Sequence, residues 1–356
     1  MRYSISIPAV CLALTVCYQS TFAQERQAPE TKQFHRWWND RNFIRPLNSP
    51  NAKKLPLIAV KGNKFVDPQG NTILFRGLSI SDPDKIENQG HWNREHFVQV
   101  KEMGTGVVRI PVHPIAWRER TPVKYLALLD QAVEWCTELG IYIIIDWHSI
   151  GNLKTGLFQD PMYNTSLTET FDFWRTIARH YQGNNTVAFY EIFNEPTSYR
   201  NQLGQITWDE WKKINEDIIR VIRAFDTETI PLVAGFDWAY DLTPLHINPI
   251  EAAGIGYVTH PYQNKRPKPW EPKWEEDFGF AASQFPVVAT EFGFVTNKDG
   301  YGDAIVSYLE GKGISWIAWV FDPEWGPRML QSWDPYKLTE SGEFFKQAMQ
   351  GKREKQ

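Results

Sequence analysis

Cysteine is scarce in this sequence, which has three cysteines among 356 residues. Two of them precede residue 23, in a stretch that we expect to be removed from the mature protein. Cys136 then remains alone, so an intramolecular disulfide and a cysteine-rich metal site are both excluded. Cys136 lies in the apolar helical pattern of residues 128–140, which indicates a buried core thiol.

An excess of positive charge is also missing, because 38 basic and 42 acidic residues are mixed along the chain and give a net charge of −4. No basic stripe is present, so nucleic acid is not an expected partner. No G-x-G-x-x-G follows the first predicted strand, and no phosphate loop, H-E-x-x-H or G-x-S-x-G occurs. These absences argue against a dinucleotide fold, serine hydrolysis and a bound metal, and no cofactor is expected.

Tryptophan, in contrast, is abundant, with 16 residues, and aromatic residues make up 14% of the chain. Complete burial of an indole ring is costly unless its N–H finds a hydrogen-bond partner. Some of these side chains belong to the core, but their number favours a groove in which several of them stack on flat ligands such as sugar rings.

The N-terminal residues have the features of a secretory signal. Arg2 supplies the positive end, residues 7–16 form a short apolar stretch, and the small residue Ala23 precedes a polar run. We expect residues 1–23 to be a signal peptide and the mature protein to be secreted or periplasmic, without a membrane span. An alternative is lipid attachment at Cys17, although the residue before it is a bulky valine.

Residues 24–56 are mostly polar and contain several prolines, which predicts an extended N-terminal arm. Three aromatic side chains are expected to hold this arm against the domain: Phe34, Trp37 and Trp38. No linker rich in Ser, Thr and Pro and no solenoid repeat follows, so residues 57–350 are interpreted as one domain that begins with a short hairpin.

From residue 73 the sequence alternates nearly continuous apolar runs with stretches whose apolar residues recur every three or four positions. The first pattern is typical of parallel strands covered on both faces, and the second of amphipathic helices, which end near Gly104, Gly140 and Gly183. Eight such units in series predict an α/β fold with a closed (β/α)8 barrel, the TIM barrel. The apolar runs are residues 73–80, 107–113, 142–149, 187–196, 231–236, 255–262, 286–294 and 314–323.

In such barrels the active site lies at the C-terminal ends of the strands. Polar groups that interrupt apolar strands are costly unless they are paired or used, so many of them at one rim indicate a functional site. The residues found at these ends are Arg109, His113, Asp146, Trp147, His148, Asn194, Glu195, His260, Tyr262, Glu291, Trp319 and Asp322.

Glu195 and Glu291 end the fourth and seventh runs, which would lie roughly opposite each other across the barrel mouth. Cleavage of a glycosidic bond needs one acid that protonates the leaving oxygen and a second carboxylate that attacks the sugar or activates water. A gap of about 5 Å between the carboxyl groups gives retention of configuration and a wider gap gives inversion. The residues alone leave both outcomes open.

Six short motifs stand in order at the ends of the predicted strands: VVRIP (107–111), IIDWH (144–148), FNEP (193–196), HPY (260–262), TEFG (290–293) and IAW (317–319). Together they resemble glycoside hydrolase family 5, the cellulase and mannanase family, whose catalytic glutamates lie on strands four and seven. The resemblance covers the chain from about residue 57 to residue 350.

The resemblance implies a retaining mechanism in which Glu195 is the general acid/base and Glu291 is the nucleophile. It implies that Arg109 keeps the nucleophile ionised through a charge-assisted hydrogen bond, which lowers the pKa of a carboxylate. Asn194 matches the family residue that binds the 2-hydroxyl of the sugar, a contact that strengthens in the transition state.

Four further positions match family residues around this pair. Tyr262 would donate a hydrogen bond to the nucleophile, and His260 would lie near the acid/base and tune its proton affinity. His148 matches a histidine that contacts the −1 sugar, and Trp319 matches the stacking floor of that subsite.

Seven residues at or after the strand ends are candidate walls of the substrate cleft: His113, Trp117, Trp238, Trp270, Trp274, Trp325 and Trp333. For His113 a paired core group is an equal alternative. We interpret Glu191, inside the fourth run, as a side chain that faces the barrel interior or forms a structural ion pair and not as a catalytic residue. Asp146 is expected to orient a neighbour, and the Trp147 side chain is expected outside the barrel.

The sequence thus predicts a secreted retaining β-glycoside hydrolase that acts on a β-linked polysaccharide or oligosaccharide. We expect an endo-β-1,4-glucanase, because this is the commonest activity among chains that resemble this one. The alternatives within the same chemistry are a β-mannanase, an exo-acting β-glucosidase or β-1,3-glucanase, and a transglycosylase. A carbohydrate-binding barrel without catalysis is a further alternative, against which the paired glutamates argue. The oligomeric state stays open.

Overall fold

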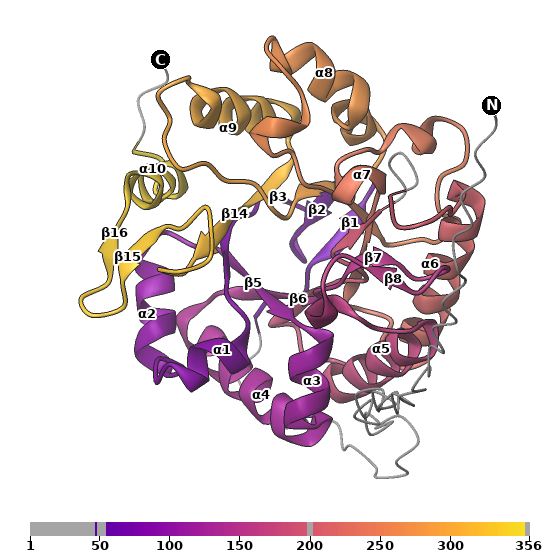
Figure 1. Cartoon of the computed structure of the whole chain (residues 1–356), viewed down its shortest axis with the longest axis horizontal. Helices are drawn as coiled ribbons and strands as arrows, with labels where there is room; N and C mark the ends of the chain where they lie inside the picture. Colours follow the sequence, from indigo (N-terminus) through magenta and orange to yellow (C-terminus); the bar gives the residue numbers. More distant parts are fainter. Residues whose placement is uncertain (1–46, 48–54, 198–201, 353–356) are drawn as a thin grey trace, which may run out of the picture. The chain divides into compact units, whose positions relative to one another are not determined.

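Eight parallel strands form a closed barrel in the computed structural model of this chain (Figure 1). Strand β14 pairs with β4 and thereby closes the ring. Each strand falls within one predicted run, except that β11 begins one residue earlier, so the predicted (β/α)8 barrel is confirmed. The strands are β4 (Arg76–Ile80), β5 (Val107–Val112), β6 (Tyr142–Trp147), β9 (Val187–Glu191), β11 (Ile230–Ala234), β12 (Gly256–Thr259), β13 (Val287–Ala289) and β14 (Ser315–Phe321).

The structure describes residues 47, 55–197 and 202–352, which all belong to one compact unit of residues 36–356. The predicted signal peptide and the arm residues Phe34, Trp37 and Trp38 lie outside the described residues. The described part of the arm contacts the barrel unit: the Leu47 N–H donates to the His180 carbonyl (2.7 Å).

Helices alternate with the strands and surround the barrel (Figure 1). Their ends follow from local chemistry: in α6, Thr207 and Glu210 form a reciprocal capping box, and α4 ends at Gly140, whose φ of 69° is left-handed. The α-helices are α1 (Pro83–Asn88), α2 (Arg94–Glu102), α3 (Pro114–Arg120), α4 (Pro122–Leu139), α5 (Leu167–Tyr181), α6 (Trp208–Arg223), α7 (Phe236–Ala239), α8 (Trp270–Asp277), α9 (Tyr301–Lys312) and α10 (Glu340–Met349). Within the described ranges, none of these helices has the length and apolarity that crossing a bilayer requires.

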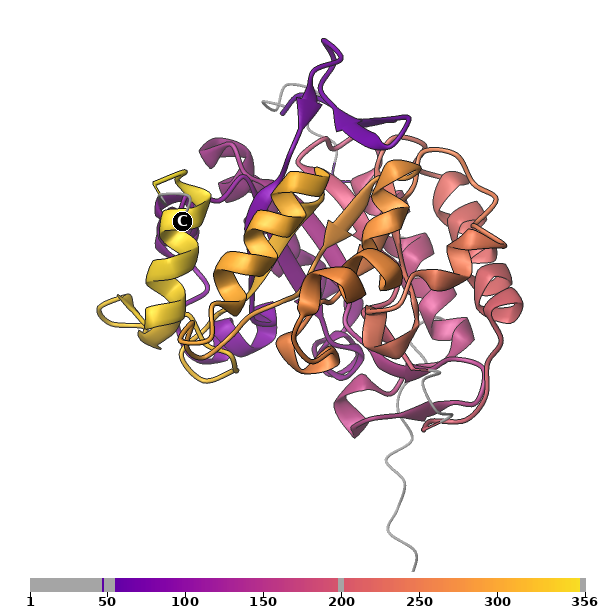
Figure 2. The ribbon, with the colours of Figure 1, turned by 90° about the horizontal axis from the view of Figure 1, so that it is seen from above.

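A small antiparallel sheet closes the N-terminal end of the barrel, away from the strand ends that carry the site. It consists of β1 (Ala59–Lys61), β2 (Lys64–Val66) and β3 (Thr72–Ile73), and it projects as the indigo ribbon at the top of Figure 2. The predicted hairpin therefore gains a third strand. Phe65 of this sheet enters the barrel interior and packs edge-on against Phe75 and Phe189.

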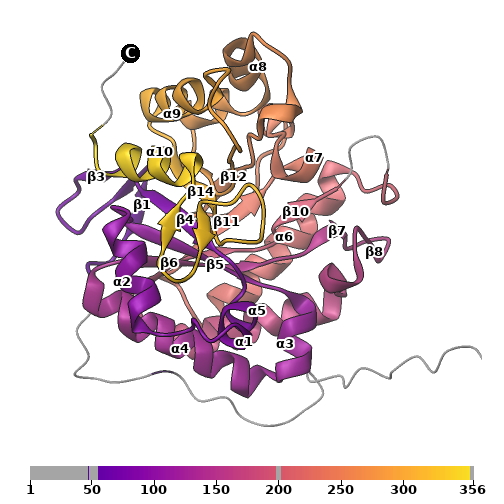
Figure 3. The same cartoon turned by 60° about the vertical axis from the view of Figure 1, so that its left-hand side comes forward.

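A second small sheet changes the predicted position of Glu195. Strand β9 ends at Glu191, and Glu195 lies on a separate strand, β10 (Glu195–Pro196), which pairs with β7 (Ile150–Asn152), itself paired with β8 (Leu157–Phe158) (Figure 3). Between the two strands the chain changes its hydrogen-bond partner. The Ile192 N–H donates to a carbonyl of β11, whereas the Asn194 N–H donates to the Trp147 carbonyl at the end of β6 and the Glu195 N–H donates to the Ser149 carbonyl. The run predicted as one strand, 187–196, is therefore two strands, which lifts Glu195 above the barrel rim.

Between β14 and α10, the chain forms a hairpin of β15 (Leu330–Ser332) and β16 (Lys337–Leu338). In the part of the chain that the structure describes, the remaining loops contain the short 3-10 helices η2 (Pro161–Tyr163), η4 (Thr243–His246), η5 (Gln263–Lys265) and η6 (Gly279–Ser283). The connection between β12 and β13 contains α8 followed by η6.

Replacement of Phe65 by Ala should destabilise the barrel, because this ring is 3% exposed and fills the barrel interior from the small sheet. We expect a loss of about 3–5 kcal/mol in the free energy of unfolding, measured by urea titration. Phe65→Leu, which keeps most of the apolar volume, should cost clearly less. Equal losses in both variants would contradict a packing role for the ring.

Candidate active site

Arg109 of β5 lies at the centre of a buried polar network and is fully shielded from solvent. Its Nε and Nη2 donate to the two oxygens of Glu191 (2.7 and 3.0 Å), and its Nη1 donates to Oε1 of Glu291 (2.7 Å). Nη2 also donates to Oδ1 of Asn194 (2.7 Å) and lies 2.9 Å from Oδ2 of Asp146. One guanidinium therefore joins side chains from four different segments of the rim. The predicted interior ion pair of Glu191 is present.

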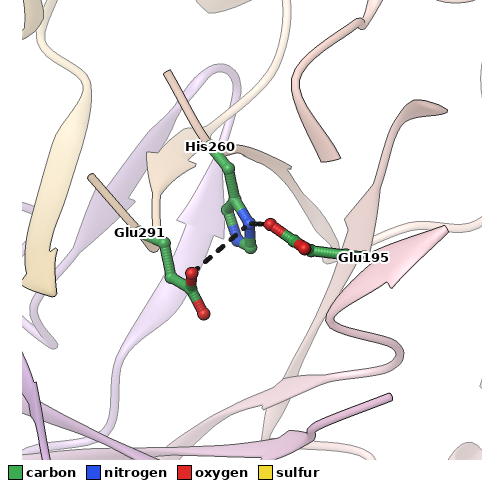
Figure 4. A group of neighbouring side chains, drawn as sticks. All are labelled: Glu195, His260 and Glu291. Atoms are coloured by element: carbon green, nitrogen blue, oxygen red, sulfur yellow. Dashed lines mark hydrogen bonds and ion pairs between the residues drawn. The ribbon is translucent and has the colours of Figure 1, made fainter. Parts of the chain in front are cut away.

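Glu195 and Glu291 face each other across His260 (Figure 4). One carboxylate oxygen of each glutamate and a His260 ring nitrogen all lie within 4.8 Å of one another. The His260 Nδ1 is 2.9 Å from Oε1 of Glu195 and 3.9 Å from Oε2 of Glu291. The distance of at most 4.8 Å between these two carboxylate oxygens is in the range of the separation of about 5–5.5 Å between the carboxyl groups of retaining glycosidases.

His260 is positively charged at neutral pH. Burial alone would lower the pKa of His260, but the surrounding carboxylates Glu291, Glu191 and Glu195 together raise it to about 9. Both ring nitrogens therefore carry hydrogen and donate, Nδ1 to Glu195 and Nε2 to the Thr290 hydroxyl (3.0 Å).

Glu291 is held on both carboxylate oxygens, because Tyr262 donates its hydroxyl to Oε2 (3.0 Å) and Arg109 donates to Oε1. Burial raises the pKa of Glu291 above its ordinary value, and the positive charges of His260 and Arg109 oppose that rise. The expected contact with Arg109 is present and lowers the pKa as expected, but desolvation outweighs the two cations, so the net shift is upward.

His148 and Trp319 form a flat surface beside the glutamates. Their rings are parallel within 4°, with centroids 5.4 Å apart. The Asp146 carboxylate lies 2.6 Å from Nδ1 of His148, so Asp146 orients a neighbour as predicted. Burial lowers the pKa of His148 well below its ordinary range. The neutral ring donates from Nδ1 to Asp146 and keeps Nε2 as an acceptor for a hydroxyl.

Asn194 carries a donor that the protein does not use. Its Oδ1 accepts from Arg109, whereas its buried Nδ2 has no hydrogen-bond partner among the described residues. A buried amide donor without a partner is costly, so this N–H₂ is a candidate contact for a sugar hydroxyl.

Two of the predicted cleft walls neighbour other residues of the site. Trp325 stacks on Trp319 with ring centroids 6.1 Å apart, and it also contacts His113. Trp238 lines a cleft together with Glu195 and Lys265. His113 itself is buried and bound through Nδ1 to an aspartate, Asp82 (2.9 Å), so it is a paired group.

An unusual backbone turn presents Trp238. Asp237, Trp238 and Ala239 have φ values of 56°, 55° and 58°, three consecutive left-handed residues without glycine. Such conformations cost of order 1–3 kcal/mol each and persist only where surrounding contacts hold them. Here the Trp238 Nε1 donates to Gln159 (2.9 Å), and the Lys265 Nζ donates to the Asp237 carbonyl and lies 5.0 Å from the indole centroid.

Two other predicted walls stand farther out. Trp270 is 9% exposed and borders a groove that runs from Tyr262 to Pro327. Trp333 lines another groove with His91 and Tyr336, in which neither glutamate takes part. Lys85 connects it to Trp325, because the Lys85 Nζ lies 5.4 Å from the Trp325 ring centroid and 5.9 Å from the Trp333 ring centroid.

Trp117 and Trp274 are not cleft walls, and this part of the prediction is wrong. Trp117 on α3 is fully buried against Phe173 of α5, and Trp274 on α8 is 2% exposed and packs against Tyr301 of α9. Both indoles point into the layer between helices, a direction that position after a strand does not determine. Trp147 is buried outside the barrel and stacks on Phe173, as expected.

Three side chains near the pair were not anticipated: Tyr163, Lys265 and Thr290. Tyr163 of η2 lies beside His113 and His148, and burial together with the two glutamates raises its pKa to about 12. Tyr163 and Lys265 come from loops, where no strand end marks a position. Thr290 immediately precedes Glu291 in the chain, and this position of a hydroxyl group beside a predicted catalytic residue was the sequence feature that could have indicated its role.

A parallel (β/α)8 barrel with two close and unlike carboxylates at its strand ends is the architecture of a glycoside hydrolase. Residues 66–324 match the sequence model described as cellulase (glycosyl hydrolase family 5). The chain belongs to glycosyl hydrolase family 5.

One solved structure with strong similarity is the β-glucanase SdGluc5_26A from Saccharophagus degradans. It is 44% identical, has a TM-score of 0.85 and covers 90% of this chain and 100% of that chain. Endoglucanase A from Butyrivibrio fibrisolvens is 28% identical over 72% of this chain and 56% of its own length, and Endoglucanase E-5 from Thermobifida fusca is 26% identical over 75% and 56%. The chain therefore spans a little over half the length of these curated relatives.

Substitution of His260 by Gln should remove a pH-dependent contribution to stability. The folded pKa of about 9 exceeds the ordinary value of 6.5, so the stabilisation is complete below pH 6.5 and is lost as the pH rises through about 9. We expect the difference in denaturation midpoint between the wild type and His260→Gln to shrink across this window. A difference that stays constant with pH would contradict a charged His260.

Proposed function

We propose that this protein is a retaining β-glucan hydrolase that works by double displacement, with Glu291 as the nucleophile and Glu195 as the general acid/base. The observation that carries the proposal is the oxygen separation of at most 4.8 Å between the two carboxylates, in combination with their different surroundings. Glu291 is fixed by Arg109 and Tyr262, whereas Glu195 faces the cleft and contacts His260.

In the first step, protonated Glu195 gives its proton to the glycosidic oxygen while Glu291 attacks the anomeric carbon. The glycosidic bond breaks, the leaving sugar departs as an alcohol, and a glycosyl ester forms on Glu291. In the second step, ionised Glu195 takes a proton from water, which attacks the same carbon and releases Glu291. A sugar hydroxyl in place of water would give transglycosylation by the same route.

The supporting residues fit the charge that develops on the sugar. The free Nδ2 of Asn194 can donate to the 2-hydroxyl, and the neutral His148 offers Nε2 as an acceptor. The Trp319 ring beside His148 provides an apolar face on which a pyranose can stack. The guanidinium of Arg109 lies 6.0 Å from the Trp319 ring centroid and donates to Glu291.

A β-1,4-glucan cleaved at internal positions is the substrate that we propose. The named relatives are endoglucanases, and the β-glucanase SdGluc5_26A has been solved with cellotetraose. Trp238 lines a cleft together with Glu195, and Trp325 stacks on Trp319, so further aromatic faces are present on which more than one sugar of a chain can stack. We further propose that residues 1–23 are a signal peptide, that residues 57–350 are the catalytic domain, and that the enzyme acts outside the cytoplasm.

Replacement of Glu291 by Ala should lower kcat by about 10⁴-fold or more, because no covalent intermediate can form. Added azide should then restore turnover of an activated aryl β-glucoside and give the α-glycosyl azide, since the small anion attacks from the vacated side. Product anomers are read by NMR. A folded Glu291→Ala variant that keeps wild-type turnover would contradict the assignment.

Glu195→Ala is the matched variant for this experiment. It should retain much of its first-step rate on aryl glucosides with good leaving groups and lose it on unactivated oligosaccharides, because only poor leaving groups need the proton. With azide it should give the β-glycosyl azide, since attack follows formation of the ester on Glu291. Equal loss on both kinds of substrate would argue that Glu195 is not the acid.

Substrate choice should appear in a panel of cello-, manno- and laminari-hexaoses. We expect internal cleavage of cellohexaose, with kcat/KM at least about tenfold above that for the other two, because a single misplaced group in a sugar pocket costs that much or more. Product sizing by chromatography distinguishes endo from exo action. Exclusive release of one short product from a chain end, or a preference for mannohexaose, would refute the endo-β-1,4-glucanase proposal.

A further inference from the structure

Glu191 is a carboxylate that the proposed reaction does not use. It is the last residue of β9, fully buried beneath the catalytic pair. Isolated carboxylates are not buried in this way, because loss of hydration would force them to take up a proton. Burial alone would raise the pKa of Glu191, but Arg109 and His260 together lower it to about 2. Glu191 is therefore a permanent anion below the cleft.

Two chains of hydrogen bonds run from this anion to the two catalytic glutamates. The first passes through Arg109, which takes both oxygens of Glu191 at 2.7 and 3.0 Å and donates its Nη1 to Glu291 at 2.7 Å. This chain is short and contains only one intervening side chain.

The second chain passes through Thr290 and His260. The Thr290 hydroxyl donates to Oε1 of Glu191 (2.9 Å), so its oxygen is free to accept from Nε2 of His260 (3.0 Å). The opposite ring nitrogen, Nδ1, then points its hydrogen at Glu195 (2.9 Å). The direction of each bond in this chain follows from the fact that ionised Glu191 can only accept.

We propose that Glu191 is a positioning residue that couples the two catalytic glutamates, fixing Glu291 through Arg109 and fixing the hydrogen that His260 presents to Glu195 through Thr290. The inference rests on the proposed roles of Glu195 and Glu291. The connections themselves are properties of the fold and are open to test without substrate.

The substitution Glu191→Gln keeps the size and shape of the side chain but removes its charge and one of the two acceptors from which the chains start. A carboxylate accepts on two oxygens, whereas an amide has one acceptor and one N–H₂ group. Whichever way the introduced amide turns, its N–H₂ faces a donor of Arg109 at one of the two present contacts. The anion that favours the protonated form of His260 is also lost.

Other charged groups surround Glu191 and must be considered in any pH experiment. They approach from five segments: Arg109 on β5, Asp146 on β6, Glu195 on β10, His260 after β12 and Glu291 after β13. Asp146 provides a matched control, because it is also a buried carboxylate on Arg109 but has no contact with His260 among the described residues.

The first measurement is the titration of His260 by NMR in the folded protein with ¹⁵N-labelled histidine, assigned by the signal missing in His260→Gln. In Glu191→Gln the midpoint should fall from about 9 by at least about one pH unit. Asp146→Asn should change it far less. This readout needs no catalysis, so it stands or falls separately from the proposed function.

The second measurement is the pH dependence of kcat and KM on cellohexaose. Glu191→Gln should lower kcat by about tenfold or more with KM nearly unchanged, because the group acts on the catalytic pair and not on the bound sugar. The acidic limb of kcat/KM should move to lower pH, since one negative charge near Glu291 has been removed.

Variants of Thr290 test the two hydrogen-bond chains separately. Thr290→Val removes the hydroxyl but leaves the contacts of Arg109, so it should lower the His260 midpoint and leave the acidic limb in place. Thr290→Ser keeps the hydroxyl and should behave as the wild type. This pair also decides the matter if Glu191→Gln does not fold.

An unchanged His260 midpoint in both Glu191→Gln and Thr290→Val would overturn the proposal and leave Glu191 as an ion-pair partner of Arg109 only. So would a folded Glu191→Gln with wild-type kcat at every pH. If the wild type hydrolyses none of the glucans while the His260 midpoint shifts as expected, the coupling is supported and the proposed function fails instead.

Discussion

A buried positive charge, the guanidinium of Arg109, is the constraint on which the rest of the site depends. A guanidinium removed from water without partners is far more costly than any single contact can offset, so its N–H groups must meet acceptors. Glu191 and Asp146 supply them from β9 and β6, and Glu291 supplies one from the segment after β13. The proposed nucleophile therefore stands where the charge balance of the barrel requires an anion. Its position is a consequence of the core and not an addition to it.

The same constraint makes the two glutamates unequal. Glu291 contacts a cation that never loses its proton, which suits a group that must stay ionised until it attacks. Glu195 contacts His260, a cation that can release its proton near pH 9, and it stands on β10, above the barrel proper. The group that we propose to change its protonation state in each half-reaction thus has an ionisable partner. The two glutamates differ in chemistry because the nearest cation of one is permanently charged and the nearest cation of the other can lose its proton.

The barrel and the strand-end residues were predictable because a parallel strand covered on both faces leaves an apolar run that ends in a polar residue. Three features were not predictable, each for a physical reason. The two-residue strand β10 is too short to show a period, so Glu195 was assigned to the end of β9. The direction of the pKa shift at Glu291 depends on burial, which only three-dimensional packing sets. Trp117 and Trp274 look like cleft residues in sequence, yet helix orientation turns them inward.

Chemistry and substrate choice have different structural origins in this molecule. Every member of the Arg109 network lies on a strand, on β10 or within two residues of a strand end, so its geometry is fixed by the barrel hydrogen bonds. The cleft wall Trp238, in contrast, lies in a connection between strands and is the middle one of three consecutive left-handed residues. The strain of this backbone must be offset by the contacts of Trp238 with Gln159 and Lys265. A strained loop changes its conformation when the neighbouring side chains that hold it are replaced. A buried ion network, in contrast, keeps its geometry only while each of its members is retained. The walls can therefore diverge, and with them the choice of sugar, while the proposed proton-transfer and ester chemistry of the network stays the same.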